Sequence, residues 1–278
     1  MLQDKTVGFI GAGNMAEAMI SGLLGSGLSQ PEKVVCADVR ADRLRDLEVR
    51  YGIRGDQDNL AVIDSADIVI YAVKPQIMND VLKETAARLN PSKLILSIAA
   101  GIPLATLAAH SREPLRLVRA MPNICVAVKA GATAIVAGPH ATAEDRTTAT
   151  AIFESVGRCV VVPAEHLLDA VTGLSGSGPA YVLLILEALS DAGVKVGLGR
   201  QEALILAAQT VLGTAQMQLQ TGDHPAQIKD RVTSPGGTTI AGLHALEKGG
   251  LRAILMDAVE AAANRSRQLG TTPPKGEH

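Results

Sequence analysis

Short apolar runs alternate with amphipathic stretches along the chain as far as Pro163. Runs of this length are typical of buried strands, and the stretches between the earlier runs have helical periodicity. The predicted strands are Lys5–Ile10, Lys33–Asp38, Ile68–Val73, Leu94–Ile98, Leu115–Arg119, Ala132–Val136 and Arg158–Val162. Near-continuous apolar strands alternating with helices predict an α/β fold, a Rossmann-type doubly wound parallel sheet covered on both faces.

The pattern changes after Pro163, where long segments with helical periodicity replace the strands. The predicted helices are Ala164–Val171, Tyr181–Val194, Arg200–Gln220, Asp223–Arg231, Ile240–Glu247 and Leu251–Leu269. We therefore expect a dinucleotide-binding Rossmann domain over residues 1–163 and an all-helical substrate-binding and dimerisation domain over residues 164–270. Residues 271–278 contain two prolines and no apolar side chain, so we expect a mobile tail.

Two of the predicted helices, Tyr181–Val194 and Arg200–Gln220, are apolar around most of their circumference. Such helices must be buried, yet roughly 110 residues of helix cannot enclose both of them. The small residues Ala207, Ala208 and Gly213 would allow close contact between helices. We therefore predict an obligate homodimer formed through the helical half.

Composition and charge narrow the classes of protein. The 278 residues are 47% hydrophobic but only 2% aromatic, so the core must be built from Ala, Val, Leu and Ile. The net charge is −2, and no basic block with interleaved aromatic residues occurs, so nucleic acid is not expected as a partner.

The cysteines and the apolar runs indicate the compartment. Cys36, Cys125 and Cys159 are scattered, which fits reduced cysteines and gives neither a disulfide framework nor the spacing of metal ligands. No room is left for a signal peptide before the first strand, and the runs Ala180–Leu189 and Ala203–Leu212 are too short to span a bilayer. We expect a cytoplasmic protein without a membrane partner.

A glycine motif follows the first predicted strand and opens a helix. Gly11-Ala12-Gly13-Asn14-Met15-Ala16 has the form G-x-G-x-x-A in the context of strand, turn and helix. Gly11 permits the tight turn, Gly13 lets a pyrophosphate approach the backbone, and Ala16 lets the helix pack closely. The pattern predicts dinucleotide binding at the helix N-terminus. The predicted contacts are Ile10, Gly11, Ala12, Gly13, Asn14 and Met15.

The end of the second predicted strand carries two conflicting signals about the dinucleotide. Asp38 stands where an acid accepts a hydrogen bond from the adenosine ribose 2′-hydroxyl, which favours NAD. Arg40 and Arg43 follow, and an arginine there can hold the 2′-phosphate of NADP. The alternative for both arginines is a solvated first turn of a helix. Asp38 and Arg40 are counted among the predicted cofactor contacts.

Small residues and prolines stand at the carboxyl ends of three later strands, where ligands of such sheets bind. These segments are Ala72-Val73-Lys74-Pro75, Ala99-Ala100-Gly101 and Met121-Pro122-Asn123, and they predict a smooth slot for a flat ring. Lys74 could contact a phosphate or a substrate anion, or could be solvated. Asn59 is expected to be the N-cap of the helix before Ile68–Val73. Its second, alternative role is a contact with the cofactor. The predicted cofactor residues here are Asn59, Ala72, Val73, Lys74, Pro75, Ala99, Ala100 and Gly101.

Two glycine-rich segments interrupt the helical half. Thr172–Tyr181 predicts a pliant loop that feeds a helix, with more glycine than a connection needs, which suggests close packing against a ligand or another backbone. Thr233–Thr239 contains Pro235-Gly236-Gly237 followed by two hydroxyl residues at a helix start. That arrangement can seat a carboxylate on free amides with a hydroxyl beside it. The alternative is a tight turn with a Ser or Thr N-cap.

These motifs together resemble pyrroline-5-carboxylate reductase. The resemblance is carried by Gly11–Met15, Ala72–Pro75, Asp169–Tyr181 and Ser234–Thr239, and it runs from about residue 5 to 269 in the right order. It implies reduction of the cyclic imine of 1-pyrroline-5-carboxylate to proline, the last step of proline synthesis. The implied cofactor is NADPH, with NADH as the alternative. It also implies an interleaved dimer, often assembled into a decamer.

The resemblance assigns roles to individual residues. The substrate carboxylate would bind backbone amides of Gly236–Thr239, the hydroxyl of Thr239 would contact the ring nitrogen as the catalytic group, and Glu165 matches a position on the substrate side. The implied substrate-binding residues are Glu165, Ser234, Gly236, Gly237, Thr238 and Thr239. Asp38, Arg40 and Arg231 stand where members vary or differ, which leaves the choice between NADP and NAD open.

Two other functions compete with this interpretation. A β-hydroxyacid dehydrogenase would need a catalytic lysine on a helix of the second half, and the candidates Lys195 and Lys229 lack the usual glycine-rich surroundings. A nucleotide-sensing protein without turnover would not need two loops that converge on the cofactor.

Overall fold

The computed structural model describes residues 2–271 of the chain. Within this range the chain forms two compact units: residues 2–177 together with 261–271, and Gly178–Glu260. The tail predicted over residues 271–278 lies outside the described residues, apart from the backbone of Thr271, which ends the last helix.

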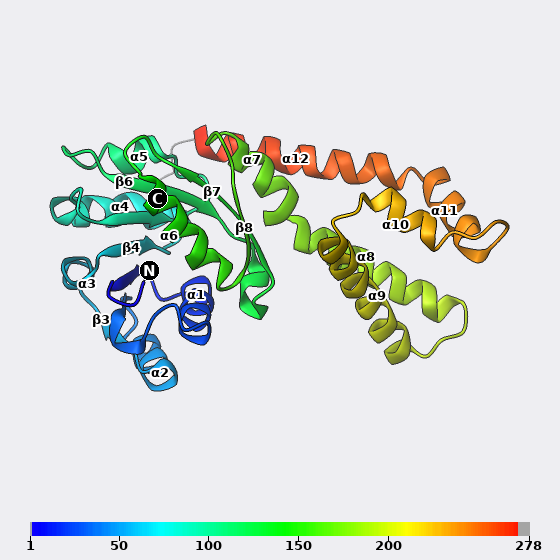
Figure 1. The fold of residues 1–278 in the computed structure, drawn as a ribbon, viewed down its shortest axis with the longest axis horizontal. Helices are drawn as coiled ribbons and strands as arrows, with labels where there is room; N and C mark the ends of the chain where they lie inside the picture. Colours follow the sequence, from blue (N-terminus) through cyan, green and yellow to red (C-terminus); the bar gives the residue numbers. More distant parts are fainter. Residues whose placement is uncertain (1, 272–278) are drawn as a thin grey trace, which may run out of the picture. The chain divides into compact units, whose positions relative to one another are not determined.

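The first unit contains one mixed sheet, which among the described residues has eight strands in the order β3-β2-β1-β4-β5-β6-β7-β8. The strands are β1 Val7–Ile10, β2 Val34–Ala37, β3 Arg54–Asp56, β4 Ile68–Tyr71, β5 Leu94–Ser97, β6 Arg116–Met121, β7 Gly131–Ala137 and β8 Gly157–Val161. Val7 of β1 lies opposite both Val34 and Ile68 in parallel register. The Rossmann-type α/β fold is confirmed (Figure 1).

Two features of the sheet differ from the prediction. The strand β3 was missed because its sequence, Arg-Gly-Asp, is polar and pairs with β2 alone, at the edge of the sheet. The prediction of a wholly parallel sheet was also wrong, since β7 runs antiparallel to β6. Residues 122–130 connect these two strands, which is shorter than the dozen or so residues that a parallel crossover needs.

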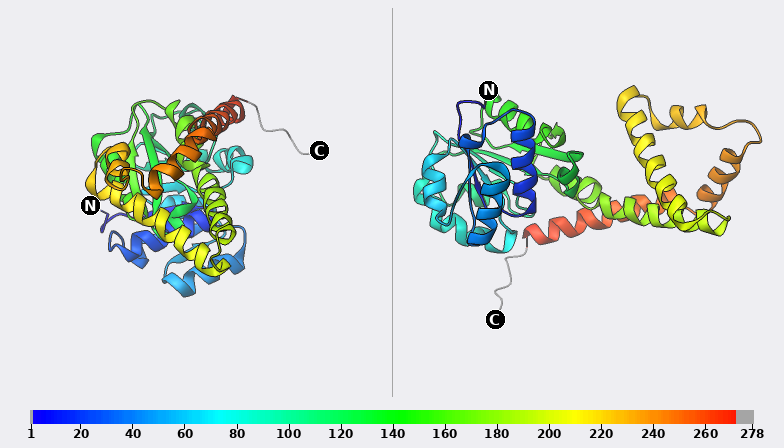
Figure 2. Two further views of the ribbon diagram at one scale, coloured as in Figure 1. Left: turned by 90° about the vertical axis from the view of Figure 1, so that its right-hand side faces the viewer. Right: turned by 90° about the horizontal axis from the view of Figure 1, so that it is seen from below.

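Helices cover both faces of the sheet. One face packs against α1 Asn14–Gly25, α2 Ala41–Tyr51 and α6 Ala143–Glu154 through side chains such as Phe9 and Ile70. The opposite face, which includes Ile10 and Tyr71, packs against α3 Asn59–Ser65, α4 Pro75–Thr85, α5 Leu104–Ala108 and α7 Leu167–Val171. Figure 2 shows α1 on one side of the strands and the cyan helices on the other. Successive strand residues thus fill two separate cores, as the near-continuous apolar strands require.

The predicted loop over Thr172–Ala180 is wrong, because the backbone there is helical. A π-helix over Thr172–Gly176 joins α7 to α8, Gly178–Lys195, and the amide of Ser177 donates to the carbonyl of Thr172 at 2.8 Å. The hydroxyls of Thr172 and Ser175 donate to the carbonyls of Leu168 and Val171 one turn earlier, a pattern that often accompanies a bend in a helix. Gly176 allows close packing, since a Cβ there would lie 3.0 Å from Cε of Met121.

The second unit consists of α8, α9 Arg200–Thr221, α10 Pro225–Arg231, α11 Thr238–Lys248 and the first part of α12, Leu251–Thr271. Helices α8 and α9 pack closely where a Cβ on Gly193 would lie 2.9 Å from Cβ of Ala203. Of the described side chains of α8 only Ser190 is buried, and of α9 only Ala203 and Ala207. The exposed apolar side chains include Leu183, Leu184, Leu204, Ile205, Leu206, Leu212, Leu219, Ile254 and Met256. This unit therefore leaves most of its apolar surface without cover in a single chain.

One helical segment, Leu167–Lys195, is long and apolar enough to cross a membrane by length and composition alone, and 11% of its most apolar window is buried within the chain. The apolar run Ala180–Leu189 is one part of this continuous helical segment, whose other parts were not predicted to be joined to it. A single such helix is weak evidence for a membrane span, because a helix covered by other protein passes the same test.

We expect the contact between β7 and β8 to depend on Gly157. This residue has φ +153°, and a Cβ there would lie 2.0 Å from the carbonyl oxygen of Gly131. Gly157→Ala should lower the free energy of unfolding by about 2 kcal/mol or more, measured by urea denaturation. Gly27→Ala is the control, because Gly27 has φ +71° but open space, and should cost about 1 kcal/mol. Equal losses in the two variants would contradict the steric argument.

Candidate functional site

The turn between β1 and α1 is packed directly onto the end of β4. Gly11 has φ +96°, and a Cβ there would lie about 3 Å from both Ala72 and Val73. The amide of Gly11 donates to the carbonyl of Ala37 at 2.8 Å, and the amide of Ala72 donates to the carbonyl of Ile10 at 2.8 Å. These bonds tie the turn to β2 and β4. Glycine is required at this position both for its backbone conformation and for its lack of a side chain.

The N-terminus of α1 is open to a ligand. Its N-cap residue is Gly13, which has no side chain to cap the first amides, and a Cβ on Gly13 would have no heavy atom within 4 Å. The first-turn amides of an α-helix lack intrahelical partners and favour an anion. Asn14 is exposed at the same end, whereas Ala12 and Ala16 are buried. This set of amide donors fits the pyrophosphate of a dinucleotide.

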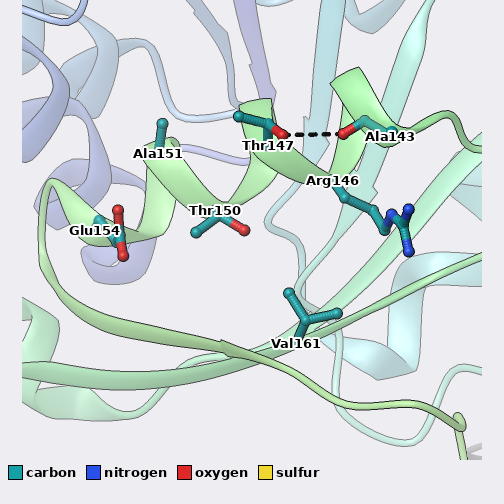
Figure 3. A pocket seen from close by; sticks show the side chains of 7 residues that line it. All are labelled: Ala143, Arg146, Thr147, Thr150, Ala151, Glu154 and Val161. Carbon is teal, nitrogen blue, oxygen red and sulfur yellow. Dashed lines mark hydrogen bonds between the residues drawn. The ribbon is translucent and has the colours of Figure 1, made fainter.

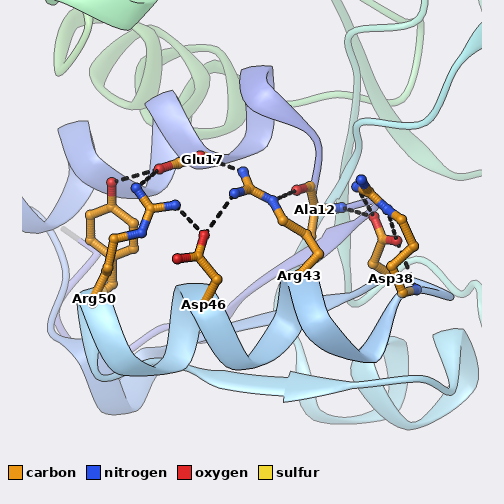
Figure 4. Close-up of polar contacts among 8 residues, drawn as sticks. Ala12, Glu17, Asp38, Arg43, Asp46 and Arg50 are labelled. Atoms are coloured by element: carbon orange, nitrogen blue, oxygen red, sulfur yellow. Dashed lines mark hydrogen bonds and ion pairs between the residues drawn. The ribbon is translucent and has the colours of Figure 1, made fainter.

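The peptide groups of Ala12 are held from both sides (Figure 4). Its amide donates to Oδ2 of Asp38 at 3.0 Å, and its carbonyl accepts from Nε of Arg43 at 2.8 Å. The guanidinium of Arg43 also pairs with Glu17, whose carboxylate accepts a hydrogen bond from the hydroxyl of Tyr51 at 3.1 Å. Arg43, with a side chain 14% exposed, thus supports the loop. The alternative of a solvated first turn does not describe Arg43, whose guanidinium pairs with Glu17 and Asp46.

Asp38 follows β2 and is fixed in place. Its Oδ1 accepts the amide of Arg40 and Nε of Arg40, both at 3.0 Å, while Oδ2 accepts the amide of Ala12. Burial favours the neutral acid, but hydrogen bonds from the Arg40 side chain and from the amides of Arg40 and Ala12 outweigh it and lower the pKa of Asp38. The Asp38 side chain is 11% exposed, and that of Arg40 is 56% exposed.

The structure brings most predicted cofactor residues to one edge of the sheet. Asp38, the Gly11–Met15 turn, Ala72–Pro75 and Ala99–Gly101 follow β2, β1, β4 and β5, which are neighbouring parallel strands. The strand order reverses between β1 and β4, and ligands of doubly wound sheets bind at such a switch point. Lys74 is exposed there, and Gly101 has φ +73°.

The expectation for Asn59 as N-cap is wrong. The N-cap of α3 is Asp58, whose carboxylate accepts the amide of Leu60 at 2.8 Å. Asn59 is the first residue of the helix, and its side-chain amide donates to Oε2 of Glu84 at 3.1 Å. Aspartate and asparagine cap helices about equally well, so the sequence did not separate the two neighbours.

Glu165 is held by a buried arginine that the sequence analysis did not single out. Its Oε1 accepts Nη1 of Arg119 at 2.7 Å and the amide of Leu104 at 2.7 Å. Arg119 lies on β6, and its side chain is 11% exposed. The available signal was a charged residue inside the apolar strand Leu115–Arg119, because such a charge needs a partner when it is buried.

Asn123 links the end of β6 to the π-helix and does not line an open slot. Its side chain accepts the amides of Cys125 at 3.2 Å and Ala132 at 3.1 Å, and donates to the carbonyl of Ser175 at 3.0 Å. Further along, the hydroxyl of Ser266 on α12 donates to Asp169 on α7 at 2.6 Å. Both sets of bonds lie within the first unit and hold α7 and the π-helix in place.

The glycine-rich bend lies in the second unit, where it opens α11. Gly236 has φ +66°, and the amide of Gly237 donates to the carbonyl of Ser234 at 3.1 Å. The N-cap of α11 is Gly237, so the alternative of a Ser or Thr N-cap is not found. Thr238 and Thr239 are the first two residues of the helix, and their amides face no capping side chain from the N-cap position. The bend therefore offers the arrangement expected of a carboxylate seat.

A surface hollow also lies on α6, facing β8 (Figure 3). It is lined by Ala143, Arg146, Thr147, Thr150, Ala151, Glu154 and Val161. The Thr147 hydroxyl donates within its own helix to the carbonyl of Ala143 at 3.0 Å. None of the predicted site residues lines this hollow.

Two family models match the chain. The pyrroline-5-carboxylate reductase dimerisation model matches residues 165–269, and the model for coenzyme F420-dependent NADP oxidoreductases matches residues 6–101.

Curated relatives match over nearly the whole chain. The pyrroline-5-carboxylate reductase of Methanosarcina acetivorans is 48% identical over 269 residues, which cover 97% of this chain and 99% of the relative. The enzyme of that name from Arabidopsis thaliana is 47% identical over 95% of each chain, and that of Escherichia coli K12 is 40% identical over 96% of this chain and 98% of the relative.

Solved structures of reductases of the same kind are also similar to this chain. A pyrroline-5-carboxylate reductase from Coxiella burnetii has a TM-score of 0.93 at 36% identity and covers 96% of this chain and 99% of its own. The Plasmodium falciparum pyrroline carboxylate reductase with NADP bound has a TM-score of 0.84 at 31% identity, covering 97% and 99%.

We expect Glu165 to contribute to stability as the partner of Arg119. Glu165→Gln keeps an oxygen that can accept the Leu104 amide but removes the charge that faces the arginine. Because Glu165 is partly exposed, the loss in free energy of unfolding should be about 1–3 kcal/mol, measured by urea denaturation. Glu113→Gln, an exposed site in the same unit, should change it by less than about 0.5 kcal/mol. Unchanged stability in Glu165→Gln would contradict the anchoring role.

Proposed function

The chain belongs to the pyrroline-5-carboxylate reductase family, and from that premise we propose which of its residues carry the reaction. It is an NAD(P)H-dependent oxidoreductase that reduces 1-pyrroline-5-carboxylate to proline in proline biosynthesis. The observation that carries this conclusion is the identity to reductases of that name over nearly the full length of the chain. Reduction of an imine does not require a lysine to deprotonate a hydroxyl, so neither Lys195 nor Lys229 has the role that a β-hydroxyacid dehydrogenase would give it.

The edge of the sheet at the β1–β4 switch point is the proposed cofactor site. Gly11, Gly13 and the first amides of α1 would hold the pyrophosphate, and Asp38 would lie at the adenosine ribose. The segments Ala72–Pro75 and Ala99–Gly101 would flank the nicotinamide, with Lys74 near an anionic group. When bound, the reduced nicotinamide supplies the hydride for the imine carbon.

The bend before α11 is the proposed substrate seat. Amides of Thr238 and Thr239 would bind the substrate carboxylate, while Ser234, Gly236 and Gly237 shape the turn that exposes them. Glu165, whose Oε1 takes the bonds from Arg119 and Leu104, would lie on the substrate side. Hydride transfer requires the seat and the cofactor site to meet in the functional assembly.

Thr239 is proposed to orient the ring nitrogen through its hydroxyl. The reaction adds one hydride to carbon and needs one proton on nitrogen. A threonine hydroxyl is poorly matched to proton donation at neutral pH, so the proton arrives with the substrate as pyrrolinium or comes from a water. The chain then contributes mainly proximity and orientation.

The second unit is a dimerisation region, and the chain forms a dimer. The uncovered apolar side chains of α8 and α9 supply the surface for a second copy. We further propose a domain division near Pro163, supported by the dimerisation match that starts at residue 165. A decamer and a cytoplasmic location stay predictions; sedimentation velocity tests the first, and fractionation of cells that express the chain tests the second.

The carboxylate seat can be tested by removing one amide hydrogen. Thr238→Pro deletes the N–H at the first position of α11, where proline is well tolerated, and the extended backbone of Gly237 suits a residue before proline. Thr238→Ala is the control, since it removes the same hydroxyl but keeps the N–H. The KM for 1-pyrroline-5-carboxylate should be roughly ten- to a hundredfold higher in Thr238→Pro than in Thr238→Ala. Similar KM values in the two variants would contradict the seat.

The role of the Thr239 hydroxyl predicts a moderate effect on catalysis. Thr239→Ala should lower kcat/KM by roughly ten- to a hundredfold, about 1.4–2.8 kcal/mol of transition-state stabilisation. Thr239→Ser keeps a hydroxyl and should recover most of the rate. A loss far beyond a hundredfold in the alanine variant would instead identify Thr239 as the proton donor. Steady-state oxidation of the cofactor with 1-pyrroline-5-carboxylate, and with 3-hydroxyisobutyrate and NAD as the negative control, provides the measurement.

A further inference from the structure

The carboxylate of Asp38 is fixed by backbone groups that do not depend on any flexible side chain. The amide of Ala12 donates to Oδ2 and the amide of Arg40 donates to Oδ1, each at 3.0 Å. Ala12 is itself buried and held on its carbonyl side by Arg43. These bonds hold Asp38 at the end of β2, and despite burial, hydrogen bonds from Arg40 and from the amide of Ala12 lower the pKa of its carboxyl, which favours the ionised form.

The two arginines near Asp38 are not equivalent. Arg43 is committed to the carbonyl of Ala12 and to the carboxylates of Glu17 and Asp46, with only 14% of its side chain exposed. Moving it would leave Glu17 without this partner and free the glycine turn. Arg40 is more exposed, but its guanidinium already contacts both oxygens of Asp38, at 3.0 and 3.3 Å. Any group bound by Arg40 in this position lies beside the Asp38 carboxylate.

NADH and NADPH differ in one part of the molecule, the 2′-position of the adenosine ribose, which is the part expected to lie at Asp38. NADH has ribose 2′- and 3′-hydroxyls, which donate hydrogen bonds to a carboxylate. NADPH has a 2′-phosphate, which carries a charge of roughly −1.5 to −2 near neutral pH and only accepts. An ionised carboxylate that cannot move suits the diol and repels the phosphate.

We propose that Asp38 makes this enzyme select NADH over NADPH, an inference that rests on the cofactor site placed above at the carboxyl edge of the sheet. The alternative is that Arg40 leaves Asp38 and holds the 2′-phosphate, which would make the chain select NADPH. Arg40 would then have to neutralise the phosphate and the carboxylate together. The two alternatives predict different effects for a substitution of Arg40.

The test measures the Kd of each reduced cofactor for the full-length protein by the change in nicotinamide fluorescence. The chain has no tryptophan, so protein emission interferes little. The unmodified protein should bind NADH at least about tenfold more tightly than NADPH. Asp38→Asn keeps an oxygen that can accept the Ala12 amide but removes the charge, and it should strengthen NADPH binding about tenfold. Asp42→Asn removes an exposed charge on the first turn of α2 and should leave the ratio of the two Kd values unchanged.

Arg40→Gln separates the two alternatives. Under the proposal it leaves NADH as the preferred cofactor. Equal or tighter binding of NADPH by the unmodified protein, together with loss of NADPH binding in Arg40→Gln, would overturn the proposal while the cofactor site stands. Binding of neither cofactor would overturn the site and the proposal with it. Circular dichroism shows whether Asp38→Asn folds. If it does not fold, the ratio of the Kd values for NADH and NADPH, measured in the unmodified protein and in Arg40→Gln, decides between the two alternatives.

Discussion

The need to cover apolar helices is the constraint on which the function of this chain depends. Helices α8 and α9 place Leu183, Leu184, Ile205 and Leu206 on their exposed surfaces, and burial of such side chains in a core is worth about 1.5–3 kcal/mol each. A single copy leaves this free energy unused, and association with a second copy recovers it. The proposed substrate seat lies in the same unit, so the region that must associate is also the region proposed to bind substrate.

The sequence was most informative where one physical requirement acts on a short segment. Gly11 must adopt a positive φ against the end of β4, and the apolar strands must fill a core on each face, so both features could be predicted from local pattern. The bend at Gly236–Gly237 followed from the same logic, because Gly236 has φ +66° and a Cβ on Gly237 would clash with Oγ of Ser234.

The features that were missed depend on partners far away in the chain. Arg119 and Glu165 are 46 residues apart, and nothing near either residue indicates their ion pair. The π-helix at Thr172–Gly176 was mistaken for a loop because glycine and serine usually disfavour helix. Here its hydroxyls donate to carbonyls of α7, and the side-chain amide of Asn123 donates to the carbonyl of Ser175. The position of Arg43 likewise follows from Glu17 and Ala12, which belong to a different helix and turn.

The bonds on both sides of Ala12 have a consequence for how a ligand enters. Because its amide and its carbonyl are both engaged within the protein, the turn proposed to receive the pyrophosphate is held in place by the chain itself. The conformational entropy of that segment is lost during folding, and little of it remains to be lost on association. Empty and loaded enzyme should therefore share one loop conformation, and exchange of oxidised for reduced nucleotide between turnovers need not wait for this part of the backbone to rearrange.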